Sequence, residues 1–281
     1  MADVDEQRKD NSSVQRSIAF GTVSGLTTSV LLQPLDRLKT LAQQQNKTNG
    51  HVTVDVLIRR VWQEHGLLGY WKGLTPTLWR VVPGVSVYFG LIEASRVFVI
   101  EPQHAWEHFI VGTGARSCAA VILHPTTLIK TRLESSLYRH TSTADAFRTV
   151  VREQGVRGLW CGLMPTLFRD APFSGFYLMF YRQQLAVVEQ WSSHDLTPSL
   201  RVLCGISAGL LACVLTQPFD VLKTTVQLYP RDYSSMRTAT ARIYTELGLK
   251  SFFKGFVLRA LRRSLASALN WTLFDELFKR T

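Results

Sequence analysis

The sequence predicts an all-α membrane protein, in which six transmembrane helices form three pseudo-symmetric repeats with short helices on one side of the membrane. Three observations lead to this fold class: a threefold internal repeat, two uncharged segments of almost transmembrane length, and basic residues concentrated in alternate loops. Apolar residues make up 46% of the 281-residue chain and charged residues 19%. This balance favours a membrane protein without proving it, so the repeat carries the assignment.

The internal repeat is built on two motifs that recur together. A proline-containing motif occurs as QPLDRLKTLAQ (33–43), HPTTLIKTRLE (124–134) and QPFDVLKTTVQ (217–227). A glycine-containing motif follows each copy, as EHGLLGYWKG (64–73), EQGVRGLWCG (153–162) and ELGLKSFFKG (246–255). The period of about ninety residues exceeds the roughly 20 to 50 residues of soluble repeat scaffolds.

This repeat sets the expected organisation of the chain. We expect a disordered N-terminal tail over 1–15 and repeats over 16–102, 103–194 and 195–281, which together form one integrated transmembrane domain. Each repeat should hold an apolar helix, a charged continuation, a short amphipathic helix and a second apolar helix. Helix bends are expected at the three repeated prolines, Pro34, Pro125 and Pro218.

Two segments, Ser17–Leu35 and Val202–Phe219, approach the roughly 20 uncharged residues that a transmembrane helix needs. The other apolar segments are shorter, because charged residues such as Arg80 interrupt them. An arginine at membrane depth is tolerated when it faces inward to water or to other protein groups. The short segments are therefore expected to line a central cavity.

The loops predict the orientation. Those within each repeat carry arginine and lysine, whereas those between repeats carry Glu101, Glu189 and Asp195. The positive-inside rule places the basic loops on the inner side and both termini on the opposite side. The net charge of +11 is then a topology signal, and no nucleic-acid partner is expected.

The sequence favours transport over catalysis. It contains no Ser/His/Asp arrangement, metal-ligand spacing or glycine-rich phosphate loop in a suitable context, so no catalytic residue, metal or cofactor is expected. The four cysteines form no CxxC pair and are interpreted as packing residues. The first residues lack the pattern of a secretory signal, and no cleaved leader is expected.

The motifs PLDRLK, PTTLIK and PFDVLK resemble the Pro-x-Asp/Glu-x-x-Lys/Arg signature of the mitochondrial carrier family, and the glycine-containing motif resembles its matrix-helix motif. The resemblance implies a pseudo-threefold barrel of six helices around one central site that works by alternating access. It also implies a multi-pass, monomeric protein of the mitochondrial inner membrane, with cardiolipin as a structural lipid. The basic loops would face the matrix and the termini the intermembrane space.

Within the family, four stretches are most similar to carriers of glycine that supply haem (5-aminolevulinate) synthesis: 83–90, 169–181, 217–230 and 260–263. Glycine imported into the matrix is therefore the expected substrate. Two alternatives stay open, namely a carrier of another small amino acid such as serine, and a non-transporting or proton-leak protein on the same fold.

The resemblance also implies ion pairs that close the matrix side of the barrel. Asp36 would pair with Lys130, and Asp220 with Lys39. The third bridge is missing, because a threonine, Thr127, stands where an acid is expected.

Lys223 is consequently left without its usual partner. Gln43 and Gln227 match the bracing glutamine of the family, and Glu134 at the same offset is a candidate substitute partner for Lys223. The alternative is that these charges are ordinary helix-end residues.

The pattern for the opposite gate is poorer. Glu93 and Arg96 fit it, and Asp275 with Arg96 makes its one regular pair. We hypothesise that these incomplete networks lower the barrier to switching without substrate and favour uniport.

The substrate site is predicted from residues that break the threefold symmetry. Arg80, Arg169 and Arg262 are equivalent, but the residues that follow them, Val81, Asp170 and Arg263, differ in charge. A zwitterion needs an anion and a cation close together.

We therefore expect Asp170 to bind the substrate ammonium, and Arg263 with Arg80 to bind its carboxylate. Arg169, next to Asp170, belongs to the same predicted substrate-binding set. The alternative is that Arg169 and Asp170 only neutralise each other. Arg116 replaces an expected glycine and is a further candidate for the carboxylate. Phe173 and its aromatic neighbours would either narrow the cavity or serve as packing residues.

Overall fold

The computed structural model describes the backbone of residues 2–45, 53–81, 83–84, 87, 105–138, 140, 142–191, 198–233 and 235–278. The regular secondary structure in these ranges is helical throughout. The helices are α1 (Ala2–Gln44), α2 (Val54–His65), η2 (Leu67–Trp71), α4 (Ala105–Glu134), α5 (Thr143–Gln154), η3 (Val156–Trp160), α6 (Leu163–Trp191), α7 (Pro198–Leu228), α8 (Met236–Leu247), η4 (Leu249–Phe253) and α9 (Phe256–Phe278). Residues 74–81 are also helical.

The order of elements follows the predicted repeat. Each of α1, α4 and α7 contains its repeated proline and leads to a short amphipathic helix, α2, α5 or α8, which is followed by a 3-10 turn. The next long helix then begins, as α6 and α9 do in the second and third repeats. The all-helical, three-repeat fold class predicted from the sequence is thus confirmed within the described ranges.

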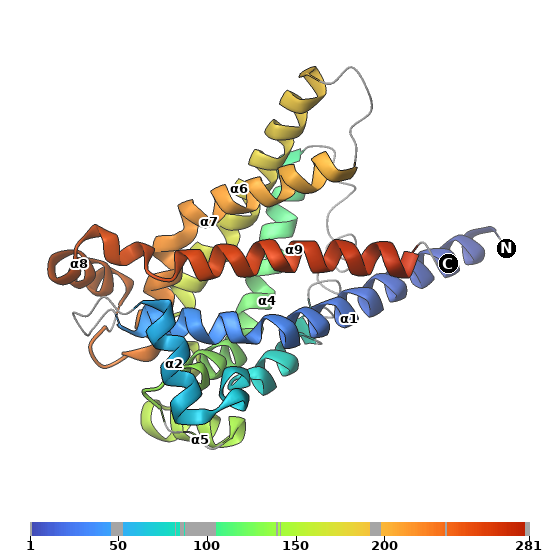
Figure 1. Cartoon of the computed structure of the whole chain (residues 1–281). Coiled ribbons are helices and arrows are strands. Elements are labelled where there is room, and N and C mark those ends of the chain that lie inside the picture. The colour runs from blue at the N-terminus through green and yellow to red at the C-terminus, as the bar shows by residue number, and fades with distance from the viewer. Residues whose placement is uncertain are drawn as a thin grey trace.

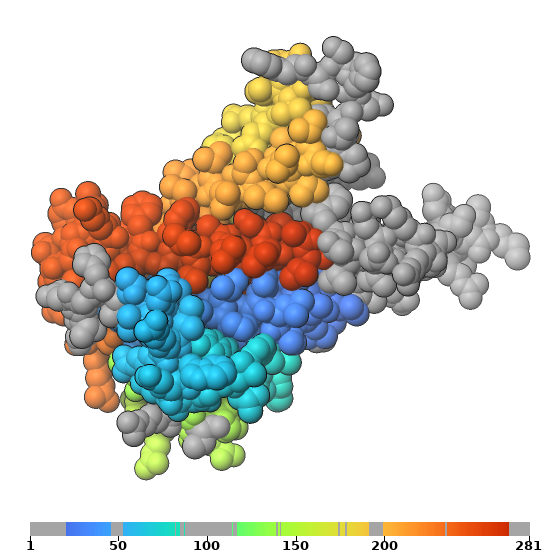
Figure 2. All heavy atoms as spheres, viewed as in Figure 1, coloured from blue at the N-terminus to red at the C-terminus, as the bar shows by residue number. Residues whose placement is uncertain are grey.

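The three repeats close into a ring. α1, α4 and α7 contact one another in every pair, and α6 packs against α7. α9 packs against α1, which joins the third repeat to the first, and Figures 1 and 2 show these two helices lying side by side. The first turns of α1 and the last turns of α9 therefore lie at the same end of the molecule (Figure 1).

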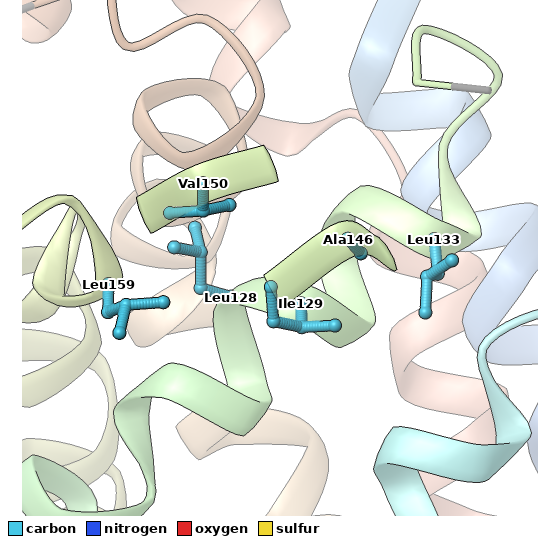
Figure 3. Close-up of a cluster of buried hydrophobic side chains, with 6 residues drawn as sticks. All are labelled: Leu128, Ile129, Leu133, Ala146, Val150 and Leu159. Carbon is cyan, nitrogen blue, oxygen red and sulfur yellow. The ribbon is translucent and has the colours of Figure 1, made fainter. Parts of the chain in front are cut away.

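The short helices pack on the long ones through equivalent apolar side chains. Val61, Val150 and Ile243 occupy the same position of α2, α5 and α8, and each is almost completely buried. One helical turn earlier lie the buried Leu57, Ala146 and Ala239, because residues four apart share a helix face. Figure 3 shows the cluster of the second repeat, in which Val150 and Ala146 face Leu128 and Ile129 of α4.

Two glycines in each repeat take a left-handed backbone, which favours glycine because it has no Cβ. The first ends the short helix and the second follows the 3-10 turn. Their φ angles are 62° at Gly66, 89° at Gly73, 69° at Gly155, 79° at Gly162, 72° at Gly248 and 74° at Gly255. The glycine-containing motif thus forms a similar turn three times in the chain.

The start of the first helix differs from the expectation. α1 begins at Ala2, whereas the sequence predicts a disordered tail over 1–15. Residues such as Glu6, Gln7, Arg8 and Lys9 have high helix propensity, which allows the helix to extend in the N-terminal direction. Among the described residues, one helix segment, Ser199–Leu228, is long and apolar enough by itself to cross a membrane.

Candidate functional site

A ring of equivalent contacts joins each proline-containing helix to the turn that follows its short helix. The residue before each proline provides the side chain, and a backbone carbonyl oxygen accepts. The contacts are Gln33 Nε2 to the Lys72 oxygen at 3.2 Å, His124 Nε2 to the Cys161 oxygen at 2.9 Å and Gln217 Nε2 to the Lys254 oxygen at 3.0 Å. The first, second and third repeats are therefore braced in the same way, although the second uses histidine.

The residues that supply these carbonyls lie in the turns, outside the long helices. Burial lowers the pKa of Lys72 and Lys254 and raises the pKa of the Cys161 thiol. The thiol keeps its proton near neutral pH, and Cys161 Sγ donates to the Val226 carbonyl at 3.5 Å. These contacts support the interpretation of Cys161 as a packing residue.

The glycine after the 3-10 turn of each repeat lies against the bracing-glutamine position of the following repeat, which is Gln43, Glu134 or Gln227. A Cβ atom placed on Gly73 would lie 2.8 Å from Glu134 Cγ, and one on Gly162 would lie 2.8 Å from Gln227 Cγ. The third contact returns to the first repeat, where a Cβ on Gly255 would lie 3.2 Å from Gln43 Cγ. The ring is thus closed by side chains as well as by helices.

The structure brings together both ion pairs predicted across the proline-containing helices. Lys130 Nζ lies 2.6 Å from Asp36 Oδ2, and Lys39 Nζ lies 2.6 Å from Asp220 Oδ2. The side chain of Asp220 is only 1% exposed. Buried partners are costly to separate, because each charge is then left uncompensated away from water.

Each of these two aspartates also receives an arginine that the sequence analysis did not assign to it. Arg262 pairs with Asp36 Oδ1, and Arg169 Nη1 lies 3.2 Å from Asp220 Oδ1. Each carboxylate is therefore shared between the two other repeats, one of which supplies a lysine and the other an arginine.

The third position of this arrangement is Thr127. Its hydroxyl donates to the Leu123 carbonyl of its own helix at 3.2 Å. Lys223 is 6% exposed, and no ion pair or hydrogen bond joins it to any residue that the structure describes. The missing bridge predicted from the sequence is therefore also missing among the described residues.

Glu134 does not substitute for that bridge, contrary to the expectation. Its Oε1 lies 3.4 Å from Lys130 Nζ and accepts from Gln33 Nε2 at 3.0 Å. Its Oε2 accepts from Thr40 Oγ1 at 2.7 Å. Lys130 is four residues from Glu134 on one helix face, so it is nearer than Lys223 on another helix.

The two predicted bracing glutamines behave differently. Gln43 donates to Asp220 Oδ2 at 2.8 Å and accepts from Thr224 Oγ1 at 2.6 Å. Gln227 is fully buried, and its Oε1 and Nε2 have no hydrogen-bond partner in the described part of the chain. Gln43 bonds to Asp220 of the preceding repeat in the ring. The residue equivalent to Asp220 for Gln227 is Thr127, which has no carboxylate.

The residues of the two ion pairs, Asp36 with Lys130 and Asp220 with Lys39, help to line a cavity of about 250 Å³ between the helices. Basic side chains outnumber acidic ones two to one. The charged residues that line it are Lys39, Arg80, Lys130, Arg169, Lys223, Arg259, Arg262 and Arg263, with Asp36, Glu134, Asp170 and Asp220. The balance of charge favours a ligand that carries a negative group.

Four of the five predicted substrate residues line this cavity: Arg80, Arg169, Asp170 and Arg263. Arg169 and Asp170 form a two-pronged pair, with Nε to Oδ1 at 2.7 Å and Nη2 to Oδ2 at 3.0 Å. The long arginine side chain bends back to its neighbour, although adjacent helical residues diverge by about 100°. The guanidinium of Arg263 stacks on the Phe173 ring at 4.1 Å.

Val81, the third residue of the asymmetric set, lies apart from the cavity lining. Its Cγ1 occupies the space where a Cβ on Gly25 would lie, at 2.8 Å. It therefore packs helix against helix. Glu93 and Arg96 lie outside the described residues, as do the side chains of Arg116 in α4 and Asp275 in α9.

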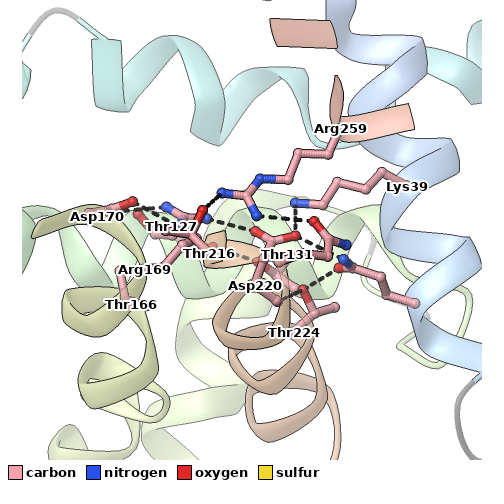
Figure 4. A network of polar contacts seen from close by, with 12 residues as sticks. Lys39, Thr127, Thr131, Thr166, Arg169, Asp170, Thr216, Asp220, Thr224 and Arg259 are labelled. Carbon is pink, nitrogen blue, oxygen red and sulfur yellow. Dashed lines mark hydrogen bonds and ion pairs between the residues drawn. The ribbon is translucent and has the colours of Figure 1, made fainter. Parts of the chain in front are cut away.

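Arg259 is a cavity residue that the sequence analysis missed. It takes the place of Thr77 and Thr166, whose hydroxyls donate to the Gly73 and Gly162 carbonyls at 2.8 Å. Arg259 instead reaches across to α7, where Nη2 donates to Thr216 Oγ1 at 2.8 Å (Figure 4). The signal was present in the sequence, since the fourth residue after the turn glycine is threonine twice and arginine once.

Comparison with known proteins agrees with this architecture. The sequence profile described as "Mitochondrial carrier protein" matches residues 10–103, 101–189 and 194–281. A Homo sapiens protein named mitochondrial glycine transporter is 42% identical over 277 residues, which cover 95% of this chain and 90% of that protein.

Two further relatives are similar over almost their whole lengths. The mitochondrial glycine transporter B of Danio rerio is 40% identical over 272 residues, covering 94% of this chain and 95% of its own. The mitochondrial glycine transporter of Xenopus laevis is 38% identical over 279 residues, covering 95% and 91%. With three matching repeats, the chain is a transporter of the inner mitochondrial membrane rather than an enzyme, and it belongs to the mitochondrial carrier family.

Proposed function

We propose that this carrier moves glycine across the inner mitochondrial membrane into the matrix, where glycine supplies haem (5-aminolevulinate) synthesis. Support comes first from the relatives, whose names state glycine transport and which cover almost the whole chain. In this proposal the turns at the repeated glycines face the matrix. The neighbouring ends of α1 and α9 face the intermembrane space.

The observation that carries the proposal is that an acid, Asp170, and a base, Arg263, both line one small, basic cavity. Asp170 would receive the substrate ammonium, while Arg263 and Arg80 would receive its carboxylate. The cavity of about 250 Å³ is smaller than the roughly 300 to 1,000 Å³ of pockets for drug-sized ligands, and the Phe173 ring is part of its lining, stacked against Arg263. A minimal amino acid suits this space.

The proposed mechanism uses the ion pairs as a gate. The substrate ammonium competes with Arg169 for the Asp170 carboxylate, and Arg169 also pairs with Asp220. Substrate binding therefore acts on the same network that ties Lys39 to Asp220 on the matrix side. Opening that side requires these pairs to separate. Since two of the three positions carry a bridge, the free energy needed to open is lower than for three bridges.

Uptake of labelled glycine into vesicles that contain the purified carrier tests this proposal. We expect uptake above protein-free vesicles, with serine and alanine as competitors in a panel. Asp170→Asn should reduce glycine uptake about tenfold or more, since a charge-assisted hydrogen bond contributes about 1.5 to 3 kcal/mol. Glu246→Gln is the matched control, because it makes the same change at an exposed acid of α8.

Two results would contradict the proposal. Absence of glycine uptake by the wild-type carrier would reject glycine as the substrate, and unchanged uptake by Asp170→Asn would reject the site. The same vesicles test uniport: uptake should proceed when no amino acid is enclosed. A strict requirement for internal amino acid would show obligatory exchange instead.

A further inference from the structure

The aspartates of the first and third repeats receive the same set of neighbours. Asp36 receives Lys130 from the second repeat and Arg262 from the third. Asp220 receives Lys39 from the first repeat and Arg169 from the second. Each carboxylate thus pairs with the lysine of the next repeat and with one arginine of the preceding repeat. These arginines belong to the equivalent set Arg80, Arg169 and Arg262.

Applied to the second repeat, this rule points Lys223 and Arg80 at Thr127. All three residues line the same cavity. Lys223 is almost fully buried without an ion pair to a described residue, and Arg80 Nε is buried without a hydrogen bond in the same ranges. By the repeat rule, Lys223 and Arg80 are therefore the two cations expected at the position from which the carboxylate is missing.

By its place in the repeat, Gln227 is a third residue expected at this position. Gln43 braces Asp220 with a hydrogen bond of 2.8 Å, and Gln227 is its equivalent for the position of Thr127. Both polar side-chain atoms of Gln227 are buried, and neither has a hydrogen bond within the described ranges. Buried polar groups are normally satisfied, so the unpaired Lys223 and the unpartnered Arg80 Nε, which line one cavity with Thr127, indicate a site for an absent acceptor.

We infer that the carboxylate of the substrate occupies this position and completes the third bridge between Lys223 and Arg80. The inference rests on the proposed function and extends it, because it adds Lys223 to the carboxylate site and gives Thr127 a role as the gap. The Thr127 hydroxyl bonds to its own helix, so it does not fill the place of a carboxylate. The ligand class is a small monocarboxylate with two or three bridging contacts.

This arrangement couples binding to the gate. Without substrate the matrix-side network holds two bridged positions, and with substrate it holds three. The carboxylate then stabilises the matrix-closed state in the way that Asp36 and Asp220 do in the other repeats. A substrate amide has no negative charge and cannot do so.

Thermal unfolding of the detergent-solubilised full chain, followed with a thiol-reactive dye, tests the inference. The buried Cys204 and Cys213 report unfolding. Sodium acetate is the probe, with sodium chloride and glycinamide at equal ionic strength as controls. Thr127→Asp supplies the missing carboxylate, and Thr127→Asn has the same shape without the charge.

Acetate should raise the unfolding temperature of the wild type, whereas chloride and glycinamide should not. Thr127→Asp should unfold at a higher temperature without ligand, lose the acetate response and show a KM for glycine about tenfold or more above wild type. Thr127→Asn should keep the acetate response. Should Thr127→Asp fail to fold, Lys223→Gln is expected to lose the acetate response.

An acetate response that persists in Thr127→Asp or in Lys223→Gln would overturn the inference, and so would an equal response to chloride. A wild-type carrier that responds to acetate in a Thr127-dependent way but does not transport glycine would overturn the proposed function alone. Glycine transport with an unchanged KM in Thr127→Asp would overturn the inference alone.

Discussion

Asp220 and Lys39 fasten the third repeat to the first, with Lys39 Nζ 2.6 Å from the Asp220 carboxylate. Asp220→Asn should destabilise the carrier strongly, by about 3 to 5 kcal/mol, because Lys39 and Arg169 lose their common counter-charge. The unfolding temperature in detergent measures the effect. Arg60→Ala is the control, since Arg60 is 58% exposed and its pair with Glu64 contributes about 0 to 1 kcal/mol. Equal shifts in both variants would contradict the structural role of the buried pair.

Alanine substitutions at two of the turn glycines can distinguish the cost of backbone strain from the cost of a steric clash. Gly155→Ala and Gly162→Ala both place a side chain on a backbone with positive φ, which costs about 1 to 3 kcal/mol. At Gly155 the new methyl group meets no atom within 4 Å, whereas at Gly162 it lies 2.8 Å from Gln227. Gly162→Ala should therefore unfold at the lower temperature, by an additional cost of about 1 to 3 kcal/mol. Identical unfolding curves would show that Gln227 moves aside freely.

Arg259 should affect transport more than folding. In Arg259→Thr the new hydroxyl can bond to the Gly255 carbonyl, as Thr77 and Thr166 do in their repeats. The unfolding temperature should stay near that of the wild type, while the KM for glycine rises about fivefold, as expected for about 1 kcal/mol of lost attraction in the cavity. Arg242→Thr on the exposed face of α8 is the matched control. A large loss of stability with an unchanged KM would assign Arg259 to packing.

His124 should be replaceable by the residue that the other repeats use. His124→Gln keeps a donor for the Cys161 carbonyl and should unfold close to the wild type, as should the reciprocal Gln217→His. His124→Ala leaves that carbonyl unsatisfied and should cost about 1 to 3 kcal/mol. Thermal unfolding of the three variants provides the comparison. Loss of stability in His124→Gln equal to that in His124→Ala would show that the imidazole makes a contact specific to the second repeat.

The fold could be predicted from the repeat, and the two ion pairs of the site from the family resemblance. The proline-containing motif recurs in phase, and the resemblance to the mitochondrial carrier family implied that its charged residues pair as Asp36 with Lys130 and Asp220 with Lys39, as the structure shows. The gap at Thr127 followed from the same alignment of repeats. Such pairs depend on which helices are neighbours, and the family resemblance supplied that information.

The second layer of contacts was not predictable, because it depends on how long side chains bend. Adjacent helical residues diverge, yet Arg169 folds back to make a two-pronged pair with Asp170 and still reaches Asp220. Glu134 pairs with Lys130 of its own helix instead of Lys223, because Lys130 is closer. Choosing among several acceptors within reach requires the relative rotation of the helices, which the sequence does not contain.

The contact of each turn glycine with the brace of the next repeat has a consequence for biogenesis. Gly73 packs against Glu134 and Gly162 packs against Gln227, and both of these partners are synthesised after the glycine. Gly255 packs against Gln43, which is synthesised with the first repeat. No repeat can complete its own turn alone. The matrix-side ring therefore closes only after the whole chain has been inserted, and a chain truncated before the third repeat should be left open and exposed to quality control by proteases.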